Sequence, residues 1–152
     1  MTDLQAIAAP TTYQTMRVEL VRVDDAFHFE AVGQSNVTQH IDGSVDIGGH
    51  NAGARPMEML LMGLAGCSAI DVILILNKQK QVIEDFRMTV DGLREKGTTP
   101  APFQKIHITY KLKGQLDPDR VKRAVDLSMD KYCSATAQLR PSAAITFSIE
   151  LN

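Results

Sequence analysis

The sequence predicts an α+β fold in which antiparallel sheets pack around a long, buried central helix. Strand-like alternation falls in residues 12–47, 86–114 and 145–151, and a nearly continuous apolar stretch covers residues 57–76. A shorter helical pattern follows Asp117. Because strands and helices are grouped along the chain, an α+β arrangement is favoured over a doubly wound parallel sheet.

The first group of strands is predicted to be a meander of three or four strands that ends at about Ile47. Residues 12–23 alternate apolar and polar side chains, Asp24-Asp25 forms a turn, and residues 27–32 run back beside them. Glycines then punctuate the chain as far as Gly53, which is typical of loops and turns.

The apolar stretch is predicted to be a helix that begins at Pro56, since proline suits the first position of a helix. Polar and basic residues end it at 77–80. The helix is apolar on nearly every face, which is typical of a helix that is covered on all sides. A monomer of 152 residues covers so long a helix with difficulty, so we expect a homodimer. Glu58 and Asp71 interrupt the stretch, which favours a buried core helix over a membrane span.

The remaining elements are predicted in the order strand, strand, helix, short helix, strand. Residues 86–95 and 105–114 form two antiparallel strands, the second with Ile106, Ile108, Tyr110 and Leu112 facing inward. Asp117-Pro118 is expected to cap and open the second helix, and Cys133 lies at or just past its end. A short helix ends before Pro141, and residues 145–151 form the final strand.

Composition narrows the classes of function. We expect one domain over residues 1–152, with residues 1–12 as a loosely ordered lead-in. The formal net charge of −2 argues against nucleic-acid or acidic-membrane partners. Residues 1–12 do not resemble a signal peptide. With only two cysteines, a cytoplasmic, reducing location is favoured, where a permanent structural disulfide is unusual.

The sequence contains no motif that indicates a metal site or a phosphate-binding loop. The four histidines are scattered, and no paired-cysteine or paired-histidine zinc motif occurs. His28 and His107 fall at outward positions of strands and are expected to be solvated. The glycine-rich residues 48–54 lack the lysine and the spacing of a phosphate-binding loop. We expect no metal and no cofactor.

The two cysteines remain as candidates for chemistry. Free cysteine is among the most buried residue types, so Cys67 in an apolar helix also fits a role as core filler. A thiol with a pKa of about 8.5 is mostly protonated at neutral pH, and a reactive one needs a stabilising cation. Arg55, Lys131 and Arg140 are the cations nearest to the cysteines in sequence. Residue patterns alone leave both interpretations open.

Two segments carry a resemblance to a known family. RPMEMLLMGLAGCSAIDVILILNK (residues 55–78) and RAVDLSMDKYCS (residues 123–134) resemble the OsmC/Ohr family of osmotically inducible and organic hydroperoxide resistance proteins, closest to its YhfA-like branch. The resemblance covers about residues 16–151. It implies an intertwined homodimer with two long central helices between antiparallel sheets. It also implies a stress-response peroxidase in which Cys67 attacks the peroxide and Cys133 resolves the resulting sulfenic acid as a disulfide, which an external dithiol reduces.

The resemblance also identifies supporting positions. Peroxidase members place a glutamate directly after the helix-opening proline and an arginine after a glycine in the preceding strand region. The matching positions here are Met57, with Glu58 one place later, and Gln34 after Gly33. Arg55 is a candidate substitute cation.

Three functions are carried forward. The first is a thiol-dependent redox protein that reduces organic hydroperoxides at a dimer-interface pocket lined by Met57, Met62 and Leu64. The second is a non-catalytic binding protein for a small hydrophobic or acyl ligand in that pocket, with a methionine-rich lining. The third, a cysteine hydrolase with a histidine base, has no supporting spacing.

Overall fold

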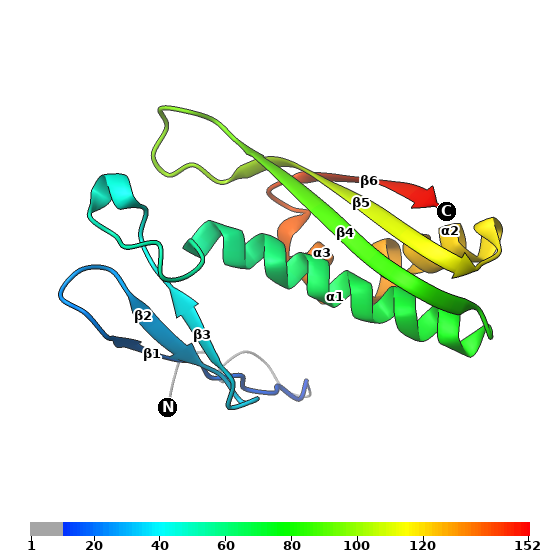
Figure 1. The fold of residues 1–152 in the computed structure, drawn as a ribbon, viewed down its shortest axis with the longest axis horizontal. Helices are drawn as coiled ribbons and strands as arrows, with labels where there is room; N and C mark the ends of the chain where they lie inside the picture. The colour runs from blue at the N-terminus through cyan, green and yellow to red at the C-terminus, as the bar shows by residue number, and fades with distance from the viewer. Residues whose placement is uncertain (1–10) are drawn as a thin grey trace. The chain divides into compact units, whose positions relative to one another are not determined.

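The computed structural model describes residues 11–152, and the chain divides into two compact units, of which the second is Met57–Asn152. The first unit holds a three-stranded sheet, and the second holds a three-stranded sheet with helices on one face (Figure 1). The architecture is α+β, as predicted. A single domain over the whole chain stays a prediction, and the expected lead-in lies outside the described residues except for residues 11 and 12.

The first unit contains the predicted meander. Strands β1 (Glu19–Arg22), β2 (Phe29–Val32) and β3 (Thr38–Ile41) pair antiparallel in that order. A 3₁₀ turn, η2 (Val45–Ile47), follows. The strand predicted over residues 12–23 is wrong in extent, because only its last part pairs with β2. Of the described residues in this sheet, Ala31 alone is buried, so the sheet has little core of its own.

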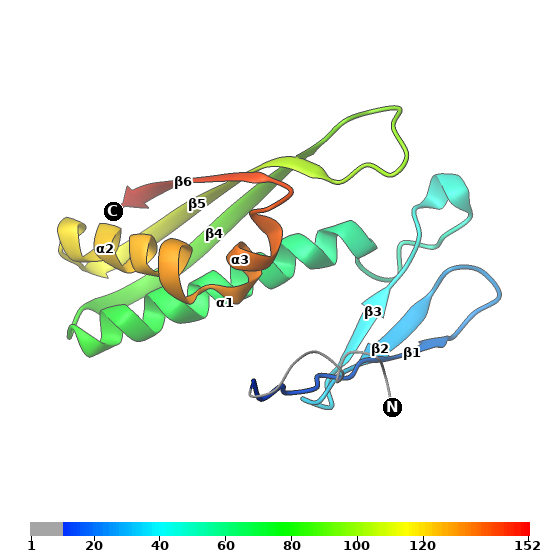
Figure 2. The same cartoon turned by 180° about the vertical axis from the view of Figure 1, so that it is seen from behind.

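The sheet of the second unit combines antiparallel and parallel pairing. Strands β4 (Val82–Arg94), β5 (Phe103–Gln115) and β6 (Ala144–Leu151) lie in that order, and β4 pairs antiparallel with β5. Strand β6 pairs parallel with β5, which corrects the prediction of purely antiparallel sheets. The reason is the helical connection between them, which runs back along the sheet so that both strands start at the same end (Figure 2).

Helix α1 (Pro56–Lys78) has the predicted limits. Pro56 opens it, where a missing N–H costs nothing. Lys80 adopts a positive φ of 57° just beyond the helix, and the Gln81 N–H donates to the Leu76 carbonyl at 3.0 Å. A left-handed residue followed by such a hydrogen bond is a common way to terminate a helix.

Within the single chain, α1 is buried along one stripe only, and coverage of its other face by a homodimer stays a prediction. Leu64, Ser68, Val72 and Leu76 are buried, four residues apart on one stripe. The opposite face is exposed, with Ile70 62% and Leu74 53% accessible. The helix is long and apolar enough to cross a membrane, a property shared by core helices. The packed stripe and the interior Asp71 support the core role.

The connection between β5 and β6 contains three helical segments. Helix α2 (Pro118–Leu127) begins as predicted, with the Asp117 side chain accepting the N–H groups of Asp119 and Arg120. One π-helical turn, η3 (Ser128–Tyr132), continues it, and Cys133 caps that turn. Helix α3 (Ser134–Leu139) follows and ends before Pro141, as expected.

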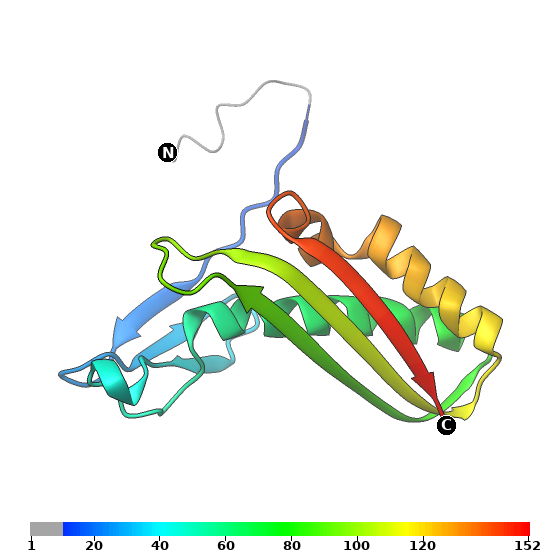
Figure 3. The same ribbon diagram turned by 90° about the horizontal axis from the view of Figure 1, so that it is seen from above.

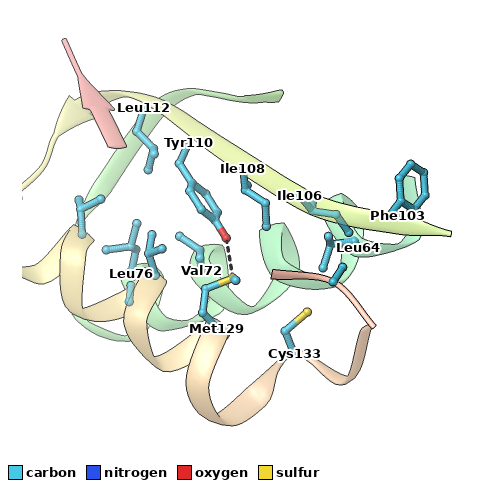
Figure 4. Close-up of a cluster of buried hydrophobic side chains, with 14 residues drawn as sticks. Leu64, Val72, Leu76, Phe103, Ile106, Ile108, Tyr110, Leu112, Met129 and Cys133 are labelled. Atoms are coloured by element: carbon cyan, nitrogen blue, oxygen red, sulfur yellow. Dashed lines mark hydrogen bonds between the residues drawn. The ribbon is translucent and has the colours of Figure 1, made fainter. Parts of the chain in front are cut away.

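The core of the second unit lies between the sheet and the helices. All three helices lie on the same face of the sheet (Figure 3). The predicted inward stripe of β5 is confirmed, since its residues are at most 1% exposed. These residues meet the buried stripe of α1 and the apolar face of α2 (Figure 4). The cluster comprises Leu64, Val72, Leu76, Phe103, Ile106, Ile108, Tyr110, Leu112, Val121, Ala124, Val125, Met129, Cys133 and Ala143.

Two histidines expected to be solvated are half-buried and hydrogen-bonded instead. His107 Nδ1 lies 2.7 Å from Thr146 Oγ1, and its Nε2 lies 3.0 Å from Ser148 Oγ, across the parallel pair β5–β6. His28 Nε2 lies 2.9 Å from His40 Nδ1 on the neighbouring strand. Polar neighbours on adjacent strands therefore provide the partners that water was expected to provide.

Burial of two ionisable groups in this core predicts a loss of stability at alkaline pH. Burial raises the pKa of the Cys133 thiol and the pKa of the Tyr110 phenol. The unfolded chain therefore releases these protons at lower pH than the folded chain. The free energy of unfolding is unaffected by them at neutral pH and falls as pH rises from about 8.5 to 11.

Urea unfolding at a series of pH values measures this slope. Cys133→Ser and Tyr110→Phe should each flatten it, whereas Tyr132→Phe, at a tyrosine that is 49% exposed, should leave it as in the wild type. An unfolding free energy that stays constant through this pH range contradicts the prediction.

Candidate redox site

Cys67 lies on α1 between the packed and exposed faces of that helix. It follows buried Leu64 by three positions and precedes exposed Ile70 by three, and residues so spaced are neighbours on a helix surface. Its side chain is half-buried and packs against the core cluster. A thiol at this boundary contacts the core while retaining access from outside the chain.

Cys133 lies in the core, at the junction between η3 and α3. It is 4% exposed, and its side chain points into the apolar cluster (Figure 4). Its backbone N–H donates to the Ser128 carbonyl at 2.8 Å. The Thr136 N–H donates to Cys133 Sγ at 3.4 Å, so the sulfur caps the start of α3.

Cys67 and Cys133 are separated by 65 residues in sequence, and the electrostatics of Cys133 relates them. Burial is the main cause that raises the pKa of the Cys133 thiol; hydrogen bonds from Thr136 oppose this effect, and the Cys67 thiol adds to it. Cys67 is thus one of the groups that influence the Cys133 thiol. Both are free cysteines, and no disulfide bond joins them.

Beside the thiols lies a chain of buried hydroxyl groups. Ser68, the residue after Cys67, has its Oγ 2.5 Å from the Tyr110 hydroxyl and 2.9 Å from Ser128 Oγ. Ser128 Oγ also donates to Asp71 Oδ2 at 3.1 Å. These side chains come from α1, β5 and η3, so the hydrogen bonds among them connect these three elements.

Met57 and Glu58, the predicted supporting residues on α1, are too distant along the helix axis to contact Cys67 from within this helix. Glu58 is nine positions before Cys67, which corresponds to about 13 Å along a helix axis. Met57 is half-buried and lines a pocket with residues of the β4–β5 loop, including Thr98 and Pro100. Neither side chain contacts the thiol from within this helix.

Arg55 and Gln34, the other two supporting candidates, belong to the first unit. Arg55 Nη1 donates to Asn51 Oδ1 at 2.7 Å, which ties the segment before α1 to itself. Gln34 Nε2 donates to the Thr15 carbonyl at 3.0 Å. These two hydrogen bonds are local to that unit.

Within one chain, Met57, Met62 and Leu64 do not line a common pocket, and the predicted pocket at a dimer interface stays a prediction. Leu64 is completely buried in the core, while Met62 is 55% exposed and lines a separate hollow with Glu58. A pocket of about 360 Å³ lies further along α1. It is lined by Asp71, Leu74, Ile75, Lys78, Gln79, Leu127 and Tyr132.

Sequence reasoning missed the buried hydroxyls. A tyrosine on the inward face of a strand requires a partner for its hydroxyl, and this was the available signal for Tyr110. Serines within helices gave no such signal, because their partners lie 42 and 60 positions away in sequence. Within residues 11–152, no group of three or more histidine, cysteine or acidic side chains is arranged to hold a metal ion.

Comparison with known proteins identifies the family. The OsmC-like protein family matches residues 49–148, which include both cysteines. Protein YhfA of Escherichia coli K12 is 41% identical over 97 residues, covering 63% of this chain and 72% of that protein. The fold is similar to that of a hypothetical protein from Aquifex aeolicus VF5, with a TM-score of 0.76 and 28% identity over 92% of this chain and 99% of the other. It is also similar to that of an organic hydroperoxide resistance protein OsmC from Legionella pneumophila, with a TM-score of 0.65 over 92% of this chain and 99% of the other. The two sequences are 14% identical, and at this identity the similarity concerns the fold alone. The predicted membership is confirmed: this chain belongs to the OsmC-like protein family.

Proposed function

We propose that this chain is a thiol-dependent redox protein that reduces organic hydroperoxides, with Cys67 as the attacking and Cys133 as the resolving cysteine. The observation that carries the proposal is that two free thiols, one half-buried and one buried, lie in the segment that matches the OsmC-like family, with Cys67 among the groups that raise the pKa of Cys133. An organic hydroperoxide resistance protein among its structural neighbours is consistent with this substrate class.

The reaction needs no cofactor. The Cys67 thiolate attacks the terminal peroxide oxygen, the O–O bond breaks, and Cys67 becomes a sulfenic acid while the alkoxide takes up a proton and leaves as an alcohol. The Cys133 sulfur then attacks the Cys67 sulfur. A disulfide forms, the S–O bond breaks, and the departing hydroxide takes the proton of the Cys133 thiol to leave as water. An external dithiol reduces the disulfide by exchange.

The environments of the two thiols suit these different roles. Burial raises the pKa of Cys133, so this thiol stays protonated and does not compete for peroxide. Cys67 is half-buried and is therefore more accessible to a substrate than the buried Cys133. A cytoplasmic location suits this cycle, because reduction there keeps the disulfide transient.

Peroxide consumption by variant proteins tests the roles. With cumene hydroperoxide and a dithiol, Cys67→Ser should lower the rate at least about 100-fold, because the nucleophile is lost. Cys133→Ser should retain oxidation of Cys67 but accumulate sulfenic acid, detected by mass spectrometry after trapping. Ser134→Ala, an exposed neighbour of Cys133, serves as the matched control. A wild-type rate equal to that of Cys67→Ser refutes the proposal.

We also propose that the chain acts as a homodimer through the exposed face of α1. This face carries Gly63, Gly66, Ile70 and Leu74, and a Cβ atom added at either glycine meets nothing within 4 Å. Small residues beside apolar ones allow the close approach of a second helix, and an exposed apolar patch of this kind is typical of an interaction site.

Light scattering after size exclusion measures the assembly. The wild type should have twice the 16.7 kDa mass of one chain. Ile70→Asp should yield monomers, because an unpaired carboxylate is costly in an apolar interface. Thr89→Asp, at an exposed position of β4, adds the same charge elsewhere and should remain dimeric. Monomeric wild-type protein contradicts this part of the proposal.

The pocket of about 360 Å³ on α1 favours binding of a small hydrophobic ligand as the second candidate function. Its size is within the range of ligand sites, and apolar Leu74, Ile75 and Leu127 form much of its lining. Native mass spectrometry of protein as purified should then detect a ligand that survives Cys67→Ser and is lost in Leu127→Asp. Ligand-free protein in all samples opposes this function.

A further inference from the structure

The segment that carries Cys133 is held by an unusual turn. Helix α2 ends at Leu127, and residues 128–132 form a single π-helical turn. Its hydrogen bond runs from the Cys133 N–H to the Ser128 carbonyl, five residues back, at 2.8 Å. Single π turns within helices are rare and occur frequently at functional sites. Relaxation of this turn to an ordinary α-helical one would change the direction of Cys133 by about 100° around the helix axis.

The side chain of Ser128 connects this turn to the helix that carries Cys67. Ser128 Oγ lies 2.9 Å from Oγ of Ser68, the residue directly after Cys67, and donates to Asp71 Oδ2 at 3.1 Å. One residue is therefore bound to Cys133 through its carbonyl and to the Cys67 region of α1 through its hydroxyl. Ser68 and Ser128 are both fully buried, so water does not compete for these hydrogen bonds.

The directions of these hydrogen bonds form a consistent series. The Asp71 carboxylate only accepts, so the Ser128 hydroxyl donates to it and accepts from Ser68. Ser68 Oγ also lies 2.5 Å from the Tyr110 hydroxyl, which keeps its proton because burial raises the pKa of Tyr110 and which donates to Met129 Sδ at 3.5 Å. A series of donors that ends on a charged acceptor is stronger than isolated neutral hydrogen bonds.

We propose that Ser128 is a positioning residue that holds Cys133 in register with Cys67 for the resolving step. This inference rests on the proposed function. The resolving step forms the S–S bond as the S–O bond of the Cys67 sulfenic acid breaks, with hydroxide leaving as water after taking the Cys133 proton. Disulfide geometry is specific, and the rate of such a reaction depends on how well the reacting atoms are prepositioned.

Trapping of the intermediate separates the two steps. Reduced protein is mixed with cumene hydroperoxide in the presence of dimedone, and mass spectrometry gives the ratio of trapped Cys67 sulfenic acid to the Cys67–Cys133 disulfide. Ser128→Ala should raise this ratio about tenfold or more, because Cys133 is less well placed. Ser68→Ala removes the partner hydroxyl from the α1 side and should act in the same direction. If Ser128→Ala does not fold, the ratio measured for Ser68→Ala tests the proposal instead.

Val125→Ala is the matched control, because it creates a cavity in the same core without touching the hydroxyl series. Its ratio should stay near that of the wild type. A wild-type ratio in the serine variants, or an equal rise in Val125→Ala, overturns the positioning role while leaving the proposed function intact. Absence of both sulfenic acid and disulfide from the wild type shows instead that the proposed function has failed.

Discussion

The second unit depends on the packing of one stripe of α1 against the inward face of β5. Leu64, Val72 and Leu76 on the helix meet Ile108, Tyr110 and Leu112 on the strand in a single cluster, and all six are at most 1% exposed. Burial of each such side chain contributes about 1.5–3 kcal/mol. This contact fixes the rotation of α1 about its own axis. The rotation in turn determines where Cys67 and Ser68 point.

The polar groups inside this apolar core are arranged so that each has a partner. A buried hydroxyl without a partner costs about 1–3 kcal/mol, whereas a paired one is nearly neutral. Ser68, Ser128 and Tyr110 satisfy one another, and Met129 Sδ lies 3.5 Å from the Tyr110 hydroxyl. Such pairs are directional, unlike apolar contacts. They therefore specify one relative placement of α1, β5 and the π turn.

Sequence reasoning succeeded where the signal was local. The limits of α1, the cap at Asp117 and the inward stripe of β5 follow from proline placement, side-chain capping and period-two alternation, which neighbouring residues determine. It failed where the outcome depended on distant parts of the chain. Parallel pairing of β6 depends on the path of the whole α2–α3 connection.

The same distinction applies to the candidate site. Proximity of Cys67 and Cys133 was expected only from the family resemblance, since no periodicity relates positions so far apart. The serine partners were missed because a serine inside a helix is compatible with both a solvated and a buried setting. Within one chain, Leu64 faces the core whereas Met57 lines a pocket with residues of the β4–β5 loop, so a spacing of seven positions does not by itself give two residues a shared environment.

The position of Cys67 at the boundary of two helix faces has a consequence for control of its chemistry. The core-facing side fixes the orientation of the sulfur, whereas whatever covers Ile70 and Leu74 sets the local dielectric and the entry of water. Orientation and solvation of one thiol are thus governed by separate surfaces. A substitution on the outer surface can therefore change the solvation of this thiol without altering the packing of the core stripe of α1.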